Sequence, residues 1–128
     1  NGPANLFLTP IVKKMDSDYK NNGNITLELK NGQEVELVLN FSTLYKIRGL
    51  KKESYEKYNK IIIQGQKDVM DIVTILYMAY LCANINNLDA CMNEMEFMDN
   101  LPYDPGMLSR KCNELIMPKK KKDSVKLS

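Results

Sequence analysis

Residues 25–39 read ITLELKNGQEVELVL, and this stretch decides the fold. Apolar and polar residues alternate on either side of an Asn31-Gly32 pair, which is typical of two short strands joined by a tight turn. The first strand begins at Ile25, and the second runs from about Gln33 to Leu39. The sequence therefore predicts an N-terminal β-hairpin.

The register of the hairpin follows from the need to place both apolar rows on one face. A two-residue loop would send the two rows to opposite faces. A three-residue loop with Gly32 in the left-handed conformation keeps them together. The predicted cross-strand pairs are Leu27 with Val35 and Ile25 with Leu37. A lone hairpin is marginal in water, so helices must cover its apolar face.

Start and stop signals after the hairpin predict about five helices. The central one runs from about Val69 to Ala83, with Asp68 as its cap, and is apolar on nearly all sides. At about fifteen residues it is shorter than the roughly twenty that a bilayer requires. The predicted fold class is α+β, mostly α, with the N-terminal β-hairpin packed on a compact bundle of about five helices.

Two helices are predicted between the hairpin and this central helix. Ser42 is the expected cap of the first, and Gly49 is expected to end it in the left-handed conformation. Apolar and aromatic residues at helical spacing predict the second, which closes near Gly65.

Two further helices are predicted after the central one. Asn87 is the expected cap of a single helix that passes through Met98 and ends before Pro102. The last helix is expected to start at Asp104-Pro105, because proline is favoured at the first helical position.

The length of 128 residues suits one domain, which we place at residues 25–117. Residues 1–24 are predicted to form a flexible segment, and the first fourteen, which precede Met15, are interpreted as added to the native chain or processed from it. Residues 118–128 contain four consecutive lysines and little apolar surface, so a disordered basic tail is predicted there.

Composition excludes most familiar hydrolase chemistries and leaves open only those that use carboxylates or lysine. The chain has no histidine, which removes imidazole bases, Ser-His and Cys-His pairs and histidine metal ligands. Its glycines form no phosphate-binding motif, and its three cysteines have no paired zinc or redox spacing. Free thiols of this kind are typical of a reduced cytoplasm. We therefore expect no enzymatic activity, no cofactor and no metal site.

The hairpin leads directly into residues 39–47, LNFSTLYKI, and then into a compact helical domain. This arrangement resembles the tail assembly chaperones of long-tailed bacteriophages, in particular siphophages and prophages of low-GC Gram-positive bacteria. The resemblance covers roughly residues 25–117 and rests on apolar positions and a turn. It implies a viral protein of the host cytoplasm, absent from the mature virion, that binds the tape measure protein and helps recruit tail tube subunits during tail morphogenesis.

The resemblance also implies other partners. In such proteins a fraction of the product is often extended by ribosomal frameshifting. Lysine codons are rich in A, so the codons of Lys119–Lys122 could form the slippery sequence that this requires. We expect the chain to form homo-oligomers and to contact this extended form of itself. No membrane partner is expected.

Binding an extended amphipathic partner requires an apolar and adaptable surface. The chain has eight methionines, four of them between residues 92 and 107, and methionine serves both irregular cores and flexible binding surfaces. Both roles stay open at this point. The candidate partner-binding residues are Tyr45, Tyr55, Tyr58, Met92, Met95, Phe97 and Met98.

A small DNA-binding regulatory protein of phage or prophage origin is the alternative function. The lysine run favours it, because cations release phosphate counterions, and two consecutive helices could form a helix-turn-helix. The helix predicted after Asn87 carries acidic residues and no lysine or arginine, and phosphates would repel such a recognition helix. Nucleic acid is therefore not expected as a partner.

Overall fold

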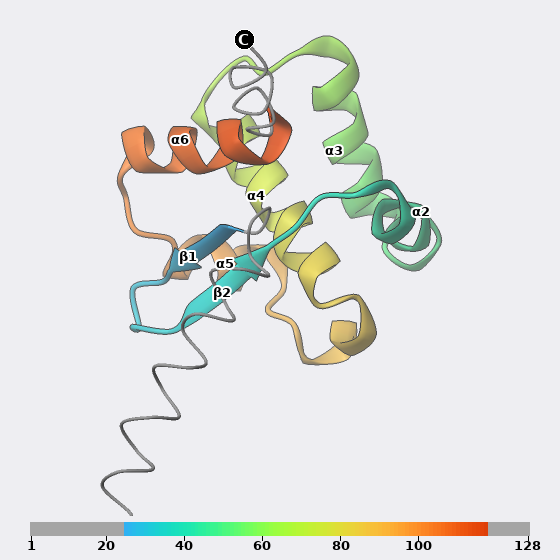
Figure 1. Ribbon diagram of the computed structural model, residues 1–128, viewed down its shortest axis with the longest axis horizontal. Coiled ribbons are helices and arrows are strands. Elements are labelled where there is room, and N and C mark those ends of the chain that lie inside the picture. The colour runs from blue at the N-terminus through green and yellow to red at the C-terminus, as the bar shows by residue number, and fades with distance from the viewer. Residues whose placement is uncertain (1–24, 118–128) are drawn as a thin grey trace, which may run out of the picture.

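The computed structural model describes residues 25–117. It confirms the α+β class, with an antiparallel hairpin followed by a mostly helical region (Figure 1). The predicted flexible segment 1–24 and basic tail 118–128 lie outside the described residues. The elements are β1 (Ile25–Glu28), β2 (Glu34–Leu37), α2 (Phe41–Leu50), α3 (Lys52–Gln64), α4 (Val69–Ala83), the 3₁₀ helix η2 (Ile85–Ala90), α5 (Glu94–Asn100) and α6 (Pro105–Ile116).

The hairpin has the predicted register. Leu27 lies opposite Val35, and Ile25 lies opposite Leu37. Gly32 adopts a φ of 87°, and its amide donates a hydrogen bond of 2.9 Å to the Leu29 carbonyl. This is the three-residue turn that places both apolar rows on one buried face.

Helix α4 lies at the centre of the structure and contacts β2, α2, α3, η2, α5 and α6. Figure 1 shows it between the hairpin and α6 on one side and α2 and α3 on the other. Every residue from Ile75 to Cys82 is buried. Both predicted ends are confirmed, and the Asp68 side chain accepts hydrogen bonds from the Met70 and Asp71 amides. Burial on all sides is the physical reason for its nearly uniform apolar sequence.

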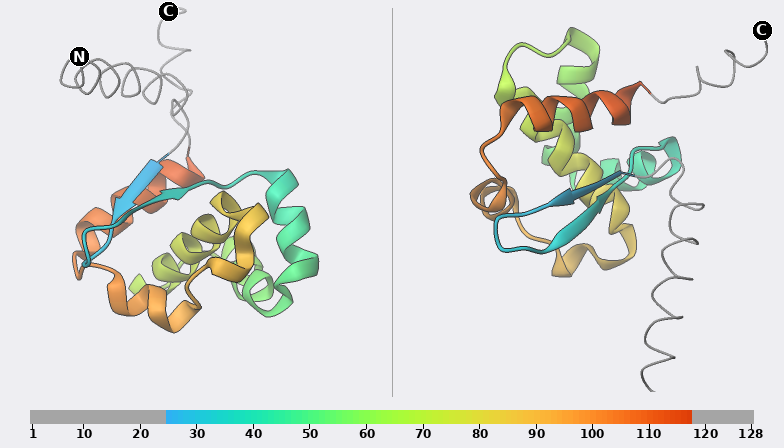
Figure 2. Two further views of the ribbon diagram at one scale, coloured as in Figure 1. Left: turned by 90° about the horizontal axis from the view of Figure 1, so that it is seen from below. Right: turned by 60° about the vertical axis from the view of Figure 1, so that its left-hand side comes forward.

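Backbone hydrogen bonds fix the hairpin to the helices. The Val38 amide, just after β2, donates to the Ala79 carbonyl of α4 at 3.1 Å. The Lys30 amide in the turn donates to the Asn100 carbonyl at the end of α5 at 2.7 Å. Figure 2 shows the hairpin lying along α4 with α6 beside β1, a contact that completes the cover of the core.

The predicted ends of α2 are wrong. Asn40, and not Ser42, is the cap, because its side chain accepts a 2.9 Å hydrogen bond from the Thr43 amide. Asparagine is at least as good a cap as serine, and Asn40 keeps the extended conformation of the preceding strand. Gly49 has no positive φ and lies within the helix, which ends at Leu50.

The single helix predicted from Asn87 through Met98 is also wrong. Asn87 lies inside η2 with non-helical backbone angles, and a new helix, α5, begins at Glu94. Asn93 and Glu96 form a capping box: the Asn93 side chain accepts from the Glu96 amide at 2.8 Å, and the Glu96 carboxylate accepts from the Asn93 amide at 3.0 Å. This local start signal divides the segment in two.

The other helix ends agree with the sequence. Gly65 follows α3 with a φ of 94°, and α5 ends at Asn100, before Pro102. Asp104 caps α6 by accepting a 3.2 Å hydrogen bond from the Met107 amide, with Pro105 at the first helical position. None of the helices within residues 25–117 has the length and apolar character that crossing a membrane requires.

The turn assignment predicts opposite effects for two glycines. Gly32→Ala should lower the free energy of unfolding by about 1–2 kcal/mol, because a side chain is strained at its positive φ. Gly49→Ala is the matched control in a helix, where an added Cβ meets nothing within 4 Å. It should raise the free energy of unfolding by roughly 0.5–1 kcal/mol. Urea unfolding followed by circular dichroism measures both, and a Gly32→Ala variant as stable as the parent would contradict the turn.

Candidate functional site

Two tyrosines of α4 hold the segment that leads into α5. The Tyr77 hydroxyl donates a 2.9 Å hydrogen bond to the Met92 carbonyl, and the Met92 amide donates a 2.8 Å hydrogen bond to the Tyr80 hydroxyl. Both rings pack on Phe97, with ring centroids 5.3 Å and 5.1 Å apart. The position of α5 against α4 therefore depends on side chains that are buried and fully hydrogen-bonded.

These tyrosine hydroxyls stay protonated near neutral pH. Burial is the main reason why the pKa of Tyr77 rises to about 12, with smaller contributions from Cys91 and Glu94. Burial also raises the pKa of Tyr80, although the hydrogen bond from the Met92 amide acts in the opposite direction. The attachment of α5 is therefore independent of pH in the physiological range.

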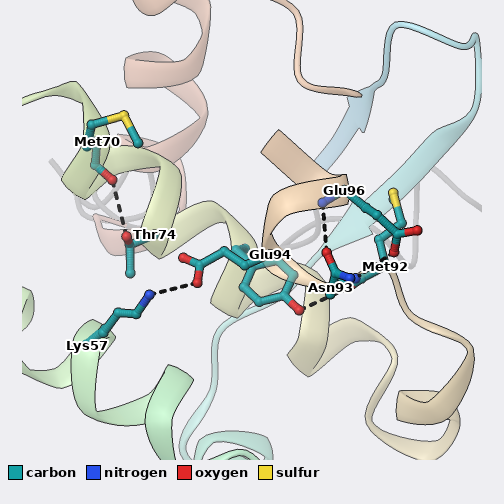
Figure 3. Close-up of polar contacts among 8 residues, drawn as sticks. Lys57, Met70, Thr74, Met92, Asn93, Glu94 and Glu96 are labelled. Carbon is teal, nitrogen blue, oxygen red and sulfur yellow. Dashed lines mark hydrogen bonds and ion pairs between the residues drawn. The ribbon is translucent and has the colours of Figure 1, made fainter. Parts of the chain in front are cut away.

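A groove of about 540 Å³ lies between α4 and α5, with α3 at one end. Figure 3 shows Lys57 of α3 reaching across it toward Glu94, with Met70 and Thr74 on the α4 side. The residues that line it are Lys57, Met70, Asp71, Thr74, Asn93, Glu94, Met95 and Met98.

A smaller cavity of about 160 Å³ adjoins this groove, because Met70 and Met98 line both. Its other residues are largely apolar and come from the start of α4, the link after α5 and the first turns of α6. We call the two cavities together the methionine groove. The lining of the smaller one is Val69, Met70, Val73, Met98, Leu101, Pro102, Tyr103, Pro105 and Leu108.

The methionine groove offers accessible apolar surface. Met70 is 52% exposed, Met95 is 63% exposed and Tyr103 is 88% exposed. The Thr74 hydroxyl donates to the Met70 carbonyl at 3.2 Å, so it contributes little polarity to the groove. Flexible thioether side chains beside an aromatic ring can adapt to apolar side chains of different shapes.

The charged residues of the groove are mostly acidic. Lys57 Nζ lies 2.8 Å from Glu94 Oε1 and is the one cation among the lining residues. From Asp68 to Ser109 the chain carries seven carboxylates and no lysine or arginine. Helices α4 and α5, which form the two walls, therefore present only negative side-chain charge.

The structure separates the seven candidate residues. Met95 and Met98 line the groove, and Met92 lies half-buried beside it, where its sulfur contacts the Asn100 amide nitrogen at 3.8 Å. Phe97 is fully buried between Tyr77 and Tyr80, so it belongs to the core.

The three candidate tyrosines lie away from the groove lining. Tyr58 is buried, and burial raises its pKa to about 12. Tyr55 is half-buried and packs on Tyr58, with their ring centroids 6.1 Å apart. Tyr45 is 71% exposed on α2, where the Arg48 guanidinium lies 5.3 Å from its ring centroid.

Four groove residues did not emerge from the sequence. Met70 belongs to a helix whose narrow polar stripe, Asp71 and Thr74, also lines the groove, but Met70 itself does not stand out from the other apolar residues of the helix. Tyr103 lies in a link between helices. Lys57 and Glu94 are 37 positions apart and meet only through tertiary packing. The capping-box pattern at Asn93 to Glu96 was the one readable signal, because it fixes where α5 begins.

The described region offers no group of side chains for a metal ion, and its two buried thiols are not activated. Across residues 25–117, no three His, Cys, Asp or Glu side chains gather so that they could hold a metal ion. Burial raises the pKa of Cys82 and, to about 11, that of Cys112, so both thiols stay protonated near neutral pH.

Comparison of the chain with protein-family models, with curated proteins and with solved structures finds no match.

Two residues of α5, Phe97 and Met95, should respond very differently to substitution. Phe97→Ala should lower the free energy of unfolding by about 3–5 kcal/mol, because it empties a buried site between two tyrosines. Met95→Gln should change it by less than about 0.5 kcal/mol, because the side chain is largely exposed. Chemical unfolding of both variants checks this, and an equally large loss for Met95→Gln would place Met95 in the core.

Proposed function

We propose that the protein is a tail assembly chaperone that binds the tape measure protein and helps recruit tail tube subunits during tail morphogenesis. The observation that carries this proposal is the methionine groove, whose accessible thioethers suit an amphipathic helix without demanding one register. The resemblance of residues 25–117 to such chaperones adds independent support. The protein acts in the host cytoplasm and does not remain in the mature virion.

The size of the groove bears on how such a chaperone works. The α5 wall has seven residues, or about two helical turns, so each copy covers only a short part of a long partner. Several copies bound to one elongated partner gain avidity because later binding events are effectively intramolecular. This supports the further proposal that the protein self-associates. From the resemblance alone, we also propose that a frameshift-extended form joins the assembly.

Co-expression tests the proposed function. The protein should keep the tape measure protein encoded by the same phage genome soluble and should co-purify with it. The double variant Met70→Gln and Met95→Gln should lose most of this effect, because it makes the exposed part of the groove polar. Ile63→Gln is the matched control, since Ile63 is 74% exposed and lies outside the groove. A tape measure protein that stays insoluble with the parent protein would contradict the proposal.

One observation favours the alternative of a small DNA-binding regulatory protein. Phe41 and Tyr45 are exposed on α2, and α2 with the start of α3 contains no acidic residue before Glu53 but four cations: Lys46, Arg48, Lys51 and Lys52. Exposed aromatic rings next to cations suit nucleic acid.

Retention on immobilised double-stranded DNA separates the two functions. Under the chaperone proposal, we expect the protein to elute below about 150 mM salt, where screening removes weak nonspecific attraction. The regulator would instead be supported if the parent protein stays bound to much higher salt and the double variant Arg48→Gln and Lys51→Gln does not.

A further inference from the structure

We propose that the methionine groove takes a basic amphipathic helix, in which lysine or arginine residues flank the apolar side chains that enter the groove. This inference rests on the proposed function and names the chemistry of the partner segment. It follows from the placement of charge around the groove.

Carboxylates border the exposed methionines on both walls. Asp71 lines the α4 side, and its carboxylate is held there by a 2.7 Å hydrogen bond from the Lys67 amide. On α5, Glu94 lies one turn before Met98, and Asp99 lies one turn after Met95. An apolar floor between acidic walls is complementary to a helix with an apolar stripe between basic residues.

Lys57 shows how a cation sits in this groove. Its ammonium reaches the Glu94 carboxylate from α3, and the lysine side chain is 57% exposed whereas that of Glu94 is 25% exposed. The carboxylate is the less exposed of the two, so the lysine side chain has more room to move into solvent. Ion pairs this exposed contribute only about 0–1 kcal/mol, so Lys57 can leave Glu94 at small cost. A lysine or arginine of the partner would then take its place.

The charge of the segment that forms the groove argues against an acidic partner. Acidic side chains would face the carboxylates of Asp71 and Glu94, which line the groove, and like charges this close are costly. A second copy of the chain could present its basic α2. That helix packs against α3 and α4, however, so only its outer face, with Phe41, Tyr45 and Leu50 exposed, is free to bind. A separate basic helix can fill the groove along its full length.

Two matched synthetic peptides test this inference with the full protein. Both carry the same leucines at positions i, i+3, i+4 and i+7, and the flanking positions are all lysine in one and all glutamate in the other. Fluorescence anisotropy measures the dissociation constant of each labelled peptide. At low salt the lysine peptide should bind at least about tenfold more tightly, and this preference should shrink as salt screens the charges.

Variants at the ion pair make the test specific. Glu94→Gln should weaken binding of the lysine peptide by about three- to tenfold, because the carboxylate that receives the cation is lost. Lys57→Gln should tighten binding by about threefold, because it removes the competing ammonium. Lys52→Gln is the matched control: it removes the same charge from α3 at an exposed pair, 4.0 Å from Glu56, and should leave binding unchanged at 150 mM salt.

Each outcome has one meaning. Equal binding of the two peptides, or weaker binding after Lys57→Gln, would overturn the inference. The inference would also be overturned if neither peptide binds and sedimentation shows an oligomer of the parent protein that Met95→Gln dissociates. A second copy of the chain would then occupy the groove. In these cases the chaperone proposal would still stand if the double variant Met70→Gln and Met95→Gln fails to keep the tape measure protein soluble. A preference for the lysine peptide without any effect on the tape measure protein would reject only the chaperone proposal.

Discussion

The burial of α4 on nearly all sides is the constraint on which the rest of the structure depends. A helix whose polar face is limited to Asp71 and Thr74 needs cover from almost every direction, and six other elements supply it. The hairpin turns its apolar rows toward α4, and the Val38 amide bonds to the helix backbone. The hydrogen bonds of Tyr77 and Tyr80 to the Met92 backbone place α5 along the same helix. The part of α4 that stays uncovered, near Met70, forms one wall of the groove.

Much of this fold could be predicted because its signals are local and periodic. Period-two alternation and one glycine set the hairpin register, and the ends of α4 follow from Asp68 and the loss of apolar residues after Ala83. The division between η2 and α5 was missed because the methionines keep a helical spacing across it. The capping box at Asn93 starts a new helix, and its Asn-x-x-Glu pattern is the feature of the sequence that marks the break.

The candidate site was predictable only in part. Methionine spacing pointed to Met95 and Met98, which do line the groove, but the same reasoning could not tell that Phe97 between them is core. Burial within a short helix is decided by what packs on it, here Tyr77 and Tyr80 from a distant segment. The contact between α3 and Glu94 likewise exists only in the folded chain. Sequence patterns therefore found one wall of the groove and missed the other.

The central claim is that an elongated partner binds in the methionine groove. Hydrogen exchange of the protein with and without the tape measure protein, read by mass spectrometry, tests it most directly. We expect added protection in the first turns of α4 and from Glu94 to Tyr103, because these segments form the groove. Segments such as α2 should exchange as in the free protein. Protection confined to α2 or to the hairpin, with the groove segments unchanged, would contradict the claim.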